Sequence, residues 1–211
     1  MVDLLGYLGR VGRRLRTRVL GRLRNPHLCM VHAATQLPPT SAPEGYSVAA
    51  AVDRSAWAEL LGAGGELGAW DEARLQLETA LVVPGTQVFL TQAGQPAAAA
   101  GVYDRTSDSW EIGWITVHPE HRRRGLGEAV TRLAMDRARS LPPRPLLLYT
   151  EDHRLDAIRL YLRLGFVPSL RHRSHRRRWR HIARRLPAAG SALVVSFLQT
   201  PDAATRDTDH T

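Results

Sequence analysis

The sequence predicts a mixed α/β domain, of the α+β type, in which strands and helices alternate along the chain. Residues 110–117 form an apolar, alternating run that is typical of a strand, and residues 126–140 repeat apolar side chains with the period of a helix. Residues 146–150 are an unbroken apolar run, which favours a buried parallel strand, and a second helix is expected to end at residue 164. This strand–helix–strand–helix order implies a sheet with a right-handed crossover.

The composition is that of one globular domain with appendages. The chain has 211 residues, of which 44% are hydrophobic, so it can bury a sizeable core. Its formal net charge is +9 and all 29 basic residues are arginine, a balance that suits an anionic ligand. The single cysteine, Cys29, excludes an internal disulfide framework and fits a reducing compartment. We find no apolar run near the roughly 18 residues of a membrane span and no signal peptide, so we expect a cytoplasmic protein.

The first 45 residues are expected to lie outside the main domain. Residues 1–30 are predicted to contain a basic amphipathic helix at 2–24, because apolar side chains recur there at helical spacing with arginines between them. Its apolar face needs a surface that covers it and buries it from water, and three such covers are open: the main domain, a second subunit or an anionic lipid surface. Residues 31–45 are predicted to be a linker rich in Pro, Ser and Thr. The apolar positions of the helix are Leu4, Leu8, Val11, Leu15 and Val19.

The main domain is predicted to span residues 46–186. Apolar patterning and turn residues divide its first part into short elements. The elements expected before the 110–117 strand are a strand at 46–52, helices at 54–62 and 70–82, and strands at 86–91 and 97–103. The helix that ends at residue 164 is expected to have Asp152 as its N-cap and to be closed by Gly165.

The chain becomes strongly basic after residue 166. A terminal helix near 174–186 is expected to start at Ser174 and to present Trp179, Ile182 and Leu186 on one face. Residues 187–211 are predicted to hold a last strand at 192–198 and then a disordered polar tail.

The most informative segment joins the 110–117 strand to the 126–140 helix. It reads Val-His-Pro-Glu-His-Arg-Arg-Arg-Gly-Leu-Gly-Glu, residues 117–128. The first N–H groups of a helix lack internal partners and carry partial positive charge, so they attract anions, and glycines let a phosphate approach the backbone. The spacing matches neither the P-loop nor the dinucleotide-binding fingerprint, which needs a glycine or alanine where Val130 stands. The alternative is an ordinary solvated helix start.

Two ordered motifs resemble the GNAT superfamily of N-acetyltransferases. The pattern Arg122-x-x-Gly125-x-Gly127, after a strand that ends in Val-x-Pro, is similar to the acetyl-coenzyme A loop of that family. The segment 157–166, in which Tyr161 follows an alanine by four residues and Gly-Phe closes the helix, is similar to the family's helix after its fifth strand. The two motifs are separated by one helix and one strand, and the resemblance covers residues 44–170.

The resemblance implies a GNAT-like mixed, mostly antiparallel sheet of six to seven strands with a splayed central parallel pair, flanked by about four helices. It also implies acetyl-coenzyme A (acetyl-CoA) as co-substrate and no metal. In the family, pantetheine lies in the splay against the fourth strand, and the loop N–H groups hold the pyrophosphate. Arg154 stands where the family has asparagine. The cofactor-binding residues expected here are Ile115, Thr116, Val117, Arg122, Arg123, Arg124, Gly125, Leu126, Gly127, Glu128 and Arg154.

The catalytic candidates are Tyr161 and Glu111. The resemblance implies that Tyr161 is the general acid that protonates the leaving thiolate, and the alternative is a core aromatic at helical spacing. Glu111 matches a position where some family members keep a catalytic glutamate. Strand alternation is expected to place Glu111 on the same face as Ile115 and Val117, and the alternative is a solvated carboxylate at the strand end.

The residues that bind the acceptor are less well defined. His118, Glu151, Asp152 and His153 are candidates because ligands of open α/β sheets lie at the carboxyl ends of strands, although helix capping explains Asp152 better. Further candidates in the first part of the domain, which ordinary packing or solvation also explains, are Gly68, Trp70, Asp71, Glu72 and Glu78.

Two functions remain open at this point. The first is an N-acetyltransferase that transfers the acetyl group from acetyl-CoA to a primary amine of a small molecule or of a peptide or protein N-terminus, by direct attack. The alternative is a GNAT-fold protein whose basic flanks, residues 2–24 and 171–185, bind nucleic acid or an anionic membrane, with acetylation secondary or absent. A homodimer is also among the expected partners.

Overall fold

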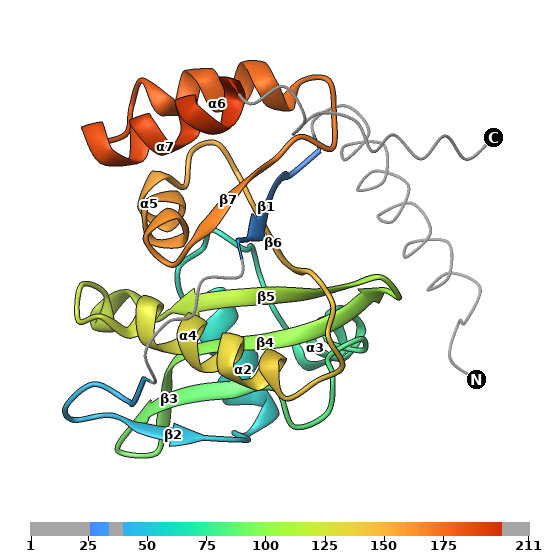
Figure 1. Ribbon diagram of the computed structural model, residues 1–211. Helices are drawn as coiled ribbons and strands as arrows, with labels where there is room; N and C mark the ends of the chain where they lie inside the picture. The colour runs from blue at the N-terminus through green and yellow to red at the C-terminus, as the bar shows by residue number, and fades with distance from the viewer. Residues whose placement is uncertain (1–25, 34–39, 200–211) are drawn as a thin grey trace.

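A single seven-stranded sheet organises the structure, a computed structural model that describes residues 26–33 and 40–199 (Figure 1). The strand order is β2-β3-β4-β5-β6-β1-β7, and every neighbouring pair is antiparallel except β5 and β6, which are parallel. The predicted mixed sheet with one central parallel pair is therefore confirmed. The strands are β1 Leu28–His32, β2 Ser47–Ala49, β3 Val88–Gln92, β4 Gln95–Thr106, β5 Ser109–Val117, β6 Leu146–Thr150 and β7 Phe166–Ser169.

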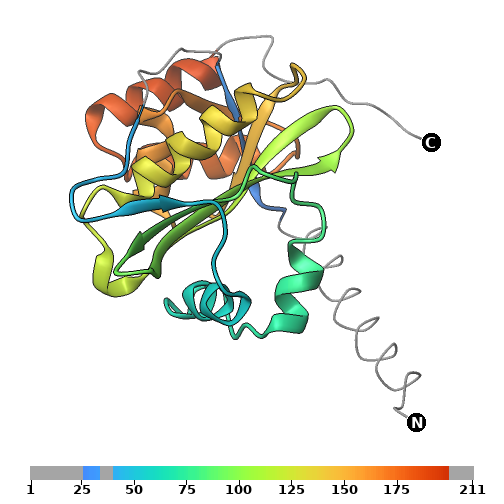
Figure 2. The same cartoon turned by 90° about the horizontal axis from the view of Figure 1, so that it is seen from below.

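Helices cover the two faces of the sheet unequally (Figure 2). Helices α4 to α7 pack on one side, which we call the α4 face, and α2 and α3 pack on the other, the α2 face. Strand alternation divides the apolar side chains between the faces: Val88 and Leu90 join the α4-face core, whereas Phe89 joins the α2-face core. The α-helices of the described residues are α2 Arg54–Gly62, α3 Glu72–Glu78, α4 Leu126–Arg139, α5 Leu155–Arg163, α6 His175–Ala183 and α7 Ala188–Gln199, with a 3-10 turn at Pro119–His121.

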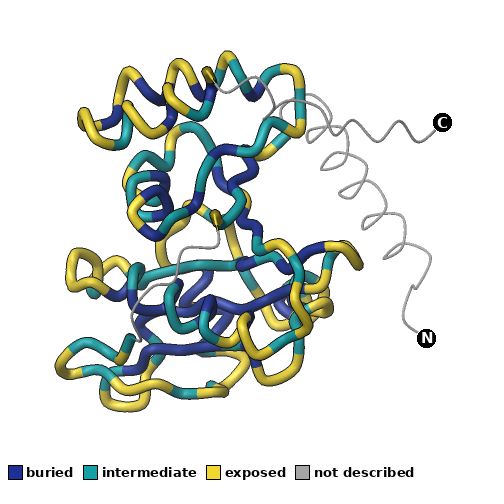
Figure 3. The backbone as a smooth tube through the Cα atoms, viewed as in Figure 1, coloured by how far each residue is buried: buried dark blue, intermediate teal, exposed yellow. Residues whose placement is uncertain are grey.

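The larger core lies between the sheet and α4 to α7. Strand residues are mostly buried and the connecting loops mostly exposed (Figure 3). Helix α6 contributes Trp179 and Ile182, both 0% exposed, which confirms the apolar face predicted for the basic terminal helix. Truncating a buried tryptophan to alanine costs about 3–5 kcal/mol, so α6 is part of the fold and not an appendage.

Strand β1 was not predicted from the sequence. Residues 28–30 were assigned to the N-terminal helical segment and 31–32 to the linker, yet they form a strand between β6 and β7. Met30 pairs with Leu148 on one side and with Pro168 on the other. A strand that is paired on both sides needs apolar side chains, and Leu-Cys-Met-Val supplies them in a run too short to distinguish from its surroundings.

The predicted last strand at 192–198 was wrong. These residues lie in α7, where the two buried side chains are Val194 and Leu198, four residues apart on one helical face. The run Ala-Leu-Val-Val-Ser-Phe-Leu has the β-branched residues of a strand, but packing against α5, α6 and β7 determines its conformation.

Two helix caps also differ from the prediction. Helix α5 begins at Arg154 as N-cap, with no side-chain capping bond, and Asp152 instead binds Arg178 of α6. Ser174 does occupy the N-cap of α6, but its side chain makes no capping bond there. Gly165 ends the α5 region with φ +84°, as expected of a closing glycine.

The other predicted elements are confirmed with changed bounds: β2 and α3 are shorter than predicted, whereas β4 is longer. The predicted helix at 2–24, residues 34–39 of the predicted linker and the polar tail from residue 200 lie outside the described residues. None of the described helices is long and apolar enough to cross a membrane.

Candidate active site

The parallel strands β5 and β6 separate partway along their length. They pair only over Trp110–Ile112 and Leu146–Leu148. Beyond Ile112, β5 continues to Val117 with β4 as its neighbour, through the pairs Ala99–Thr116 and Ala98–Val117. The backbone groups on the other edge of this stretch are thus available to an extended ligand, as an added strand would use them.

A β-bulge marks the point of separation. The β4–β5 register changes by one residue between the pairs Gly101–Gly113 and Ala99–Thr116, and Trp114 within the bulge has φ +49°. The additional residue inverts the alternation, so Ile115 packs in the α4-face core, whereas Trp114 packs in the α2-face core.

The bulge overturns the predicted orientation of Glu111. Alternation would have placed Glu111 on the face of Ile115 and Val117, but the bulge lies between them. Glu111 is on the α2 face, where its Oε1 lies 3.2 Å from the position that a Cβ on Gly113 would occupy. Its Oε2 forms an ion pair with Arg105 Nε at 3.0 Å, and its side chain is 15% exposed.

Two tryptophans and α3 surround the bulge on the α2 face. Trp114 Nε1 donates to the carbonyl oxygen of Glu78 at 3.2 Å, and its ring meets Trp70 edge-on with centroids 4.8 Å apart. The guanidinium of Arg74 lies 4.1 Å from the Trp70 ring centre. Of the acceptor candidates in this region, Trp70 therefore lies beside the bulge, whereas Asp71 accepts from the Arg74 N–H at 2.7 Å as the N-cap of α3.

The loop before α4 presents backbone N–H groups, as the sequence predicted. Gly125 is the N-cap of α4 with φ +77°, and no side chain caps the helix. Arg123 also has a positive φ, of +60°, whereas Arg124 between them does not. This alternation of backbone conformation favours a nest of N–H groups that binds an anion. Leu126 is 1% exposed and part of the core, so it offers only its N–H to a ligand.

Gly127 connects this loop to the end of β5. A Cβ on Gly127 would lie 3.6 Å from Leu160 of α5 and 3.7 Å from Val117. Those are ordinary contacts, so alanine fits and a larger side chain does not. The helix start, the free edge of β5 and α5 therefore meet at one glycine.

The three arginines of the loop have different surroundings. Arg122 Nη2 lies 3.2 Å from Glu66 Oε1 in the α2–α3 loop, and Arg123 is exposed. Arg124 Nη1 donates to the Tyr46 hydroxyl at 3.1 Å, and that hydroxyl lies 2.9 Å from Nδ1 of His121. Tyr46 was not predicted, because no sequence pattern links a residue before β2 to a loop so far along the chain.

Glu128, in the first turn of α4, has a side chain that is 44% exposed. It forms ion pairs with Arg132 and Arg163, each at 3.8 Å.

Tyr161 is buried on α5, with 6% of its surface exposed and its ring 6.2 Å from that of Phe166. Burial raises the pKa of Tyr161 to about 12, and the nearby Arg154 guanidinium opposes that rise. The phenol is therefore protonated at neutral pH. Arg154 itself donates from Nε to Glu151 Oε2 at 2.9 Å.

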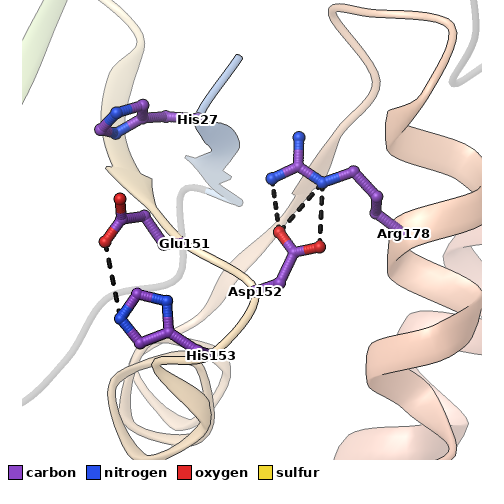
Figure 4. Close-up of a pocket in the computed structure, with 5 residues that line it drawn as sticks. All are labelled: His27, Glu151, Asp152, His153 and Arg178. Atoms are coloured by element: carbon purple, nitrogen blue, oxygen red, sulfur yellow. Dashed lines mark hydrogen bonds and ion pairs between the residues drawn. The ribbon is translucent and has the colours of Figure 1, made fainter. Parts of the chain in front are cut away.

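A pocket of about 240 Å³ lies at the carboxyl end of β6 (Figure 4). It is lined by Glu151, Asp152 and His153, which follow β6 in the sequence, and by His27 and Arg178, which were not among the candidates. Arg178 Nε donates to both carboxylate oxygens of Asp152, at 2.9 and 3.0 Å, and neutralises that charge. Glu151 and His153 approach to 3.7 Å.

Among the described residues, no group of three or more His, Cys, Asp or Glu side chains could hold a metal ion. The buried Cys29 is a free thiol.

Comparison with known proteins agrees with the fold. The chain resembles a GCN5-related N-acetyltransferase from Sphaerobacter thermophilus (TM-score 0.57, 20% identity, 67% of this chain and 47% of that one). It also resembles a Drosophila protein (TM-score 0.50, 17% identity, 74% of this chain and 54% of that one). The chain thus spans about half the length of each, and at these identities the likeness shows the fold alone. A search of curated proteins found no match. A model of the acetyltransferase (GNAT) family matches residues 50–166, more than half of the chain, and the chain therefore belongs to the GNAT acetyltransferase family.

Proposed function

We propose that the protein transfers the acetyl group of acetyl-CoA to a primary amine of a small molecule or of a peptide or protein N-terminus. The observation that supports this proposal most is the meeting of the free β5 edge with the uncapped start of α4 at Gly127. One feature suits an extended amide arm and the other a pyrophosphate.

The cofactor would follow these two features. The N–H groups of residues 123–128 would hold its pyrophosphate, with charge from Arg122 and Arg124 nearby, and the backbone of residues 115–117 would pair with pantetheine. Acetyl-CoA supplies the thioester, whose carbonyl carbon accepts the amine. At the bulge the extra residue interrupts the pairing with β4, so an N–H group there would suit the oxygen of that carbonyl, where negative charge develops.

Tyr161 is the proposed general acid. Its phenol holds a proton at neutral pH and donates it as the C–S bond breaks. The Arg154 guanidinium lowers the cost of negative charge in this region, so it assists both the phenol and the departing thiolate.

Glu111 is the proposed base for the incoming amine. Its carboxylate lies beside Gly113 of the bulge on the α2 face, opposite the face on which Tyr161 is buried. The amine would then enter from the α2 face, between the base and the acetyl group. Glu151, directly after β6, is a second carboxylate, and Arg154 Nε donates to it at 2.9 Å. Comparing Glu111→Gln with Glu151→Gln in a transfer assay separates the two, because only loss of the base lowers the pH-dependent kcat.

The test of the cofactor site is calorimetric titration with acetyl-CoA and with pantetheine, which lacks the nucleotide and its phosphates. We expect Gly127→Ala to keep the affinity for acetyl-CoA and Gly127→Leu to abolish it, because alanine fits beside Val117 and Leu160 and leucine does not. Because leucine at position 127 also crowds Val117 and Leu160 and so can destabilise the fold, Arg124→Gln is the second variant. It should weaken the binding of acetyl-CoA by about 1.4- to 5-fold, which corresponds to the roughly 0.2–1 kcal/mol of a surface charge contact, and leave the binding of pantetheine unchanged.

Unchanged acetyl-CoA affinity in both Gly127→Leu, if folded, and Arg124→Gln would contradict the loop assignment. Transfer activity is then measured over a panel of small amines and short peptides. Binding of acetyl-CoA without transfer to any of them, and without slow hydrolysis, would contradict the enzymatic role.

A further inference from the structure

Helix α6 carries a stripe of arginines that the acetyl-transfer site does not use. Arg177, Arg180 and Arg184, which we call the arginine row, are all exposed. They are three and four residues apart, so they project from one side of the helix over roughly 10 Å. Arg173 and His181 are exposed beside them.

The opposite side of α6 is fixed in the core. Trp179 and Ile182 are fully buried there. The flanks of the helix are bonded as well, because Arg178 binds Asp152 and Arg176 Nη1 donates to the carbonyl oxygen of Leu198 at 2.6 Å. The helix cannot turn the arginine row towards the protein, so the row is presented to solvent in a fixed orientation.

Among the described residues, no carboxylate forms an ion pair with the row. Residues 157–199 hold ten arginines and neither Asp nor Glu. Within the part of the chain that the structure describes, Arg177, Arg180 and Arg184 make no ion pair or hydrogen bond, whereas Arg159 of α5 reaches Asp156 at 2.9 Å. Like charges at these helical spacings repel one another, so the row is unfavourable in the isolated chain and an anionic partner would relieve it.

We infer that the arginine row binds the phosphate backbone of nucleic acid. One strand of a duplex carries a phosphate about every 3.4 Å of rise, so three arginines over roughly 10 Å match about three phosphates. Helix α6 exposes no Phe, Tyr or Trp side chain beside the row. This argues against base stacking and for contacts with the backbone that do not read sequence.

An anionic membrane fits this surface less well. Helices that bind in the plane of a bilayer insert an apolar face among the lipids. In α6 that face, with Trp179 and Ile182, is already used by the core. The exposed positions of the helix offer charge alone, which suits a phosphate backbone.

The test measures binding of the full chain to a labelled DNA duplex and to a labelled RNA hairpin, by fluorescence anisotropy at several salt concentrations. The test variant combines Arg177→Gln, Arg180→Gln and Arg184→Gln. The matched control combines Arg54→Gln, Arg137→Gln and Arg139→Gln, three exposed arginines on α2 and α4. Both variants have net charge +6, which is the original +9 less three, so total charge is equal.

We expect the row variant to bind at least about tenfold more weakly at about 100 mM salt, with the slope of log K against log salt reduced by about two to three. The control should stay within about threefold of the original protein. Arginines of residues 2–24 contribute equally to all three proteins, so the difference between the variants reports the row. The DNA and RNA arms show which backbone is preferred.

Three outcomes would overturn the inference. The first is an equal loss in both variants, which would mean that net charge alone governs binding. The second is absence of nucleic-acid binding by the original protein. The third is row-dependent binding to phosphatidylserine vesicles with none to nucleic acid. Acetyl-CoA affinity and the melting temperature are measured in parallel, and both should be unchanged in the row variant. A failure of this inference can therefore be distinguished from a failure of the proposed acetyl transfer.

Discussion

At the scale of single residues, the site is marked by backbone strain. Trp114 and Arg123 both have φ in the left-handed region, which costs non-glycine residues about 1–3 kcal/mol each. One lies in the β5 bulge and the other in the loop before α4. The third non-glycine residue with positive φ among those described is Ala93, in the turn between β3 and β4. Two of the three strained positions thus coincide with the two features assigned to the cofactor.

Removing the Tyr161 hydroxyl tests the general acid. Tyr161→Phe keeps the ring packed near Phe166, so we expect kcat to fall by about 10²-fold with little change in acetyl-CoA affinity. Because the pKa of Tyr161 is about 12, the phenol of the original enzyme stays protonated across the assay range. Its pH–rate profile should therefore show no fall near the ordinary tyrosine pKa of 10. A fully active phenylalanine variant would leave protonation of the thiolate to water.

His175 predicts a loss of stability in mild acid. It is 1% exposed and its Nδ1 lies 3.2 Å from the carbonyl oxygen of Ser169, and burial lowers its pKa below 6.5. The unfolded chain then binds the proton more readily than the folded chain, so stability falls as pH drops from about 6.5 towards the folded-state pKa. The melting temperature should decrease from pH 7 to pH 5, and less steeply in His175→Gln. An identical slope in both proteins would assign the effect to other groups, such as His32, whose pKa burial also lowers.

At the scale of elements, the β5 bulge determines which face of the sheet the later side chains of the strand occupy, and regular alternation does not predict it. The two-residue repeat of a strand predicts correctly that Glu111 and Ile112 lie on opposite faces. The prediction fails after Trp114, because one inserted residue moves every later side chain to the other face. The run Gly-Trp-Ile-Thr contains no feature that separates a bulge from a regular strand. The position of α4, which begins directly after Gly125, by contrast follows from rules that involve neighbouring residues only, and its bounds were predicted to within one residue.

Gly113 tests how tightly the bulge is built. A Cβ there would lie 3.0 and 3.1 Å from the ring of Tyr103, which is fully buried. We expect Gly113→Ala to destabilise the protein by about 1–3 kcal/mol, as overpacking does, with a lower melting temperature. The matched control is Gly190→Ala in α7, where a Cβ meets only ordinary contacts of 3.6 Å or more and alanine favours the helix. Equal effects of the two substitutions would show that the tyrosine ring moves aside.

At the scale of the whole molecule, the sequence predicted what local patterns determine and missed what distant segments bring together. The two motifs established the sheet with its parallel pair, and the buried face of α6 followed from helical spacing. The pairing of β1 with β6 and β7, the bond from Arg124 to Tyr46 and the approach of His27 to Glu151 join residues far apart in the chain. No spacing rule reaches them, because only the folded topology makes them neighbours.

The placement of β1 leads to a prediction about the N-terminal segment. Deleting residues 2–32 removes a strand that pairs on both sides, so β7 loses the strand it pairs with and β6 keeps only β5. The core also loses Leu28 and Met30, both 0% exposed. Each of these losses costs about 2–5 kcal/mol, which is comparable to the whole stability of a domain. We expect this truncation to give no cooperative melting transition.

Deleting only residues 2–25 keeps β1 and isolates the role of the segment before it. The three proposed covers for its apolar side chains predict different results. Packing on the domain predicts a lower melting temperature at unchanged molecular mass, and packing in a second subunit predicts a smaller mass by size-exclusion chromatography with light scattering. An anionic lipid surface predicts neither change, but loss of binding to phosphatidylserine vesicles. We expect a change in melting temperature or mass, because the glycines at positions 6, 9, 12 and 21 weaken a free helix by about 1 kcal/mol each and favour one that packs against protein. Loss of vesicle binding alone would instead identify the segment as a membrane anchor, and retention of all three properties would contradict each of the covers.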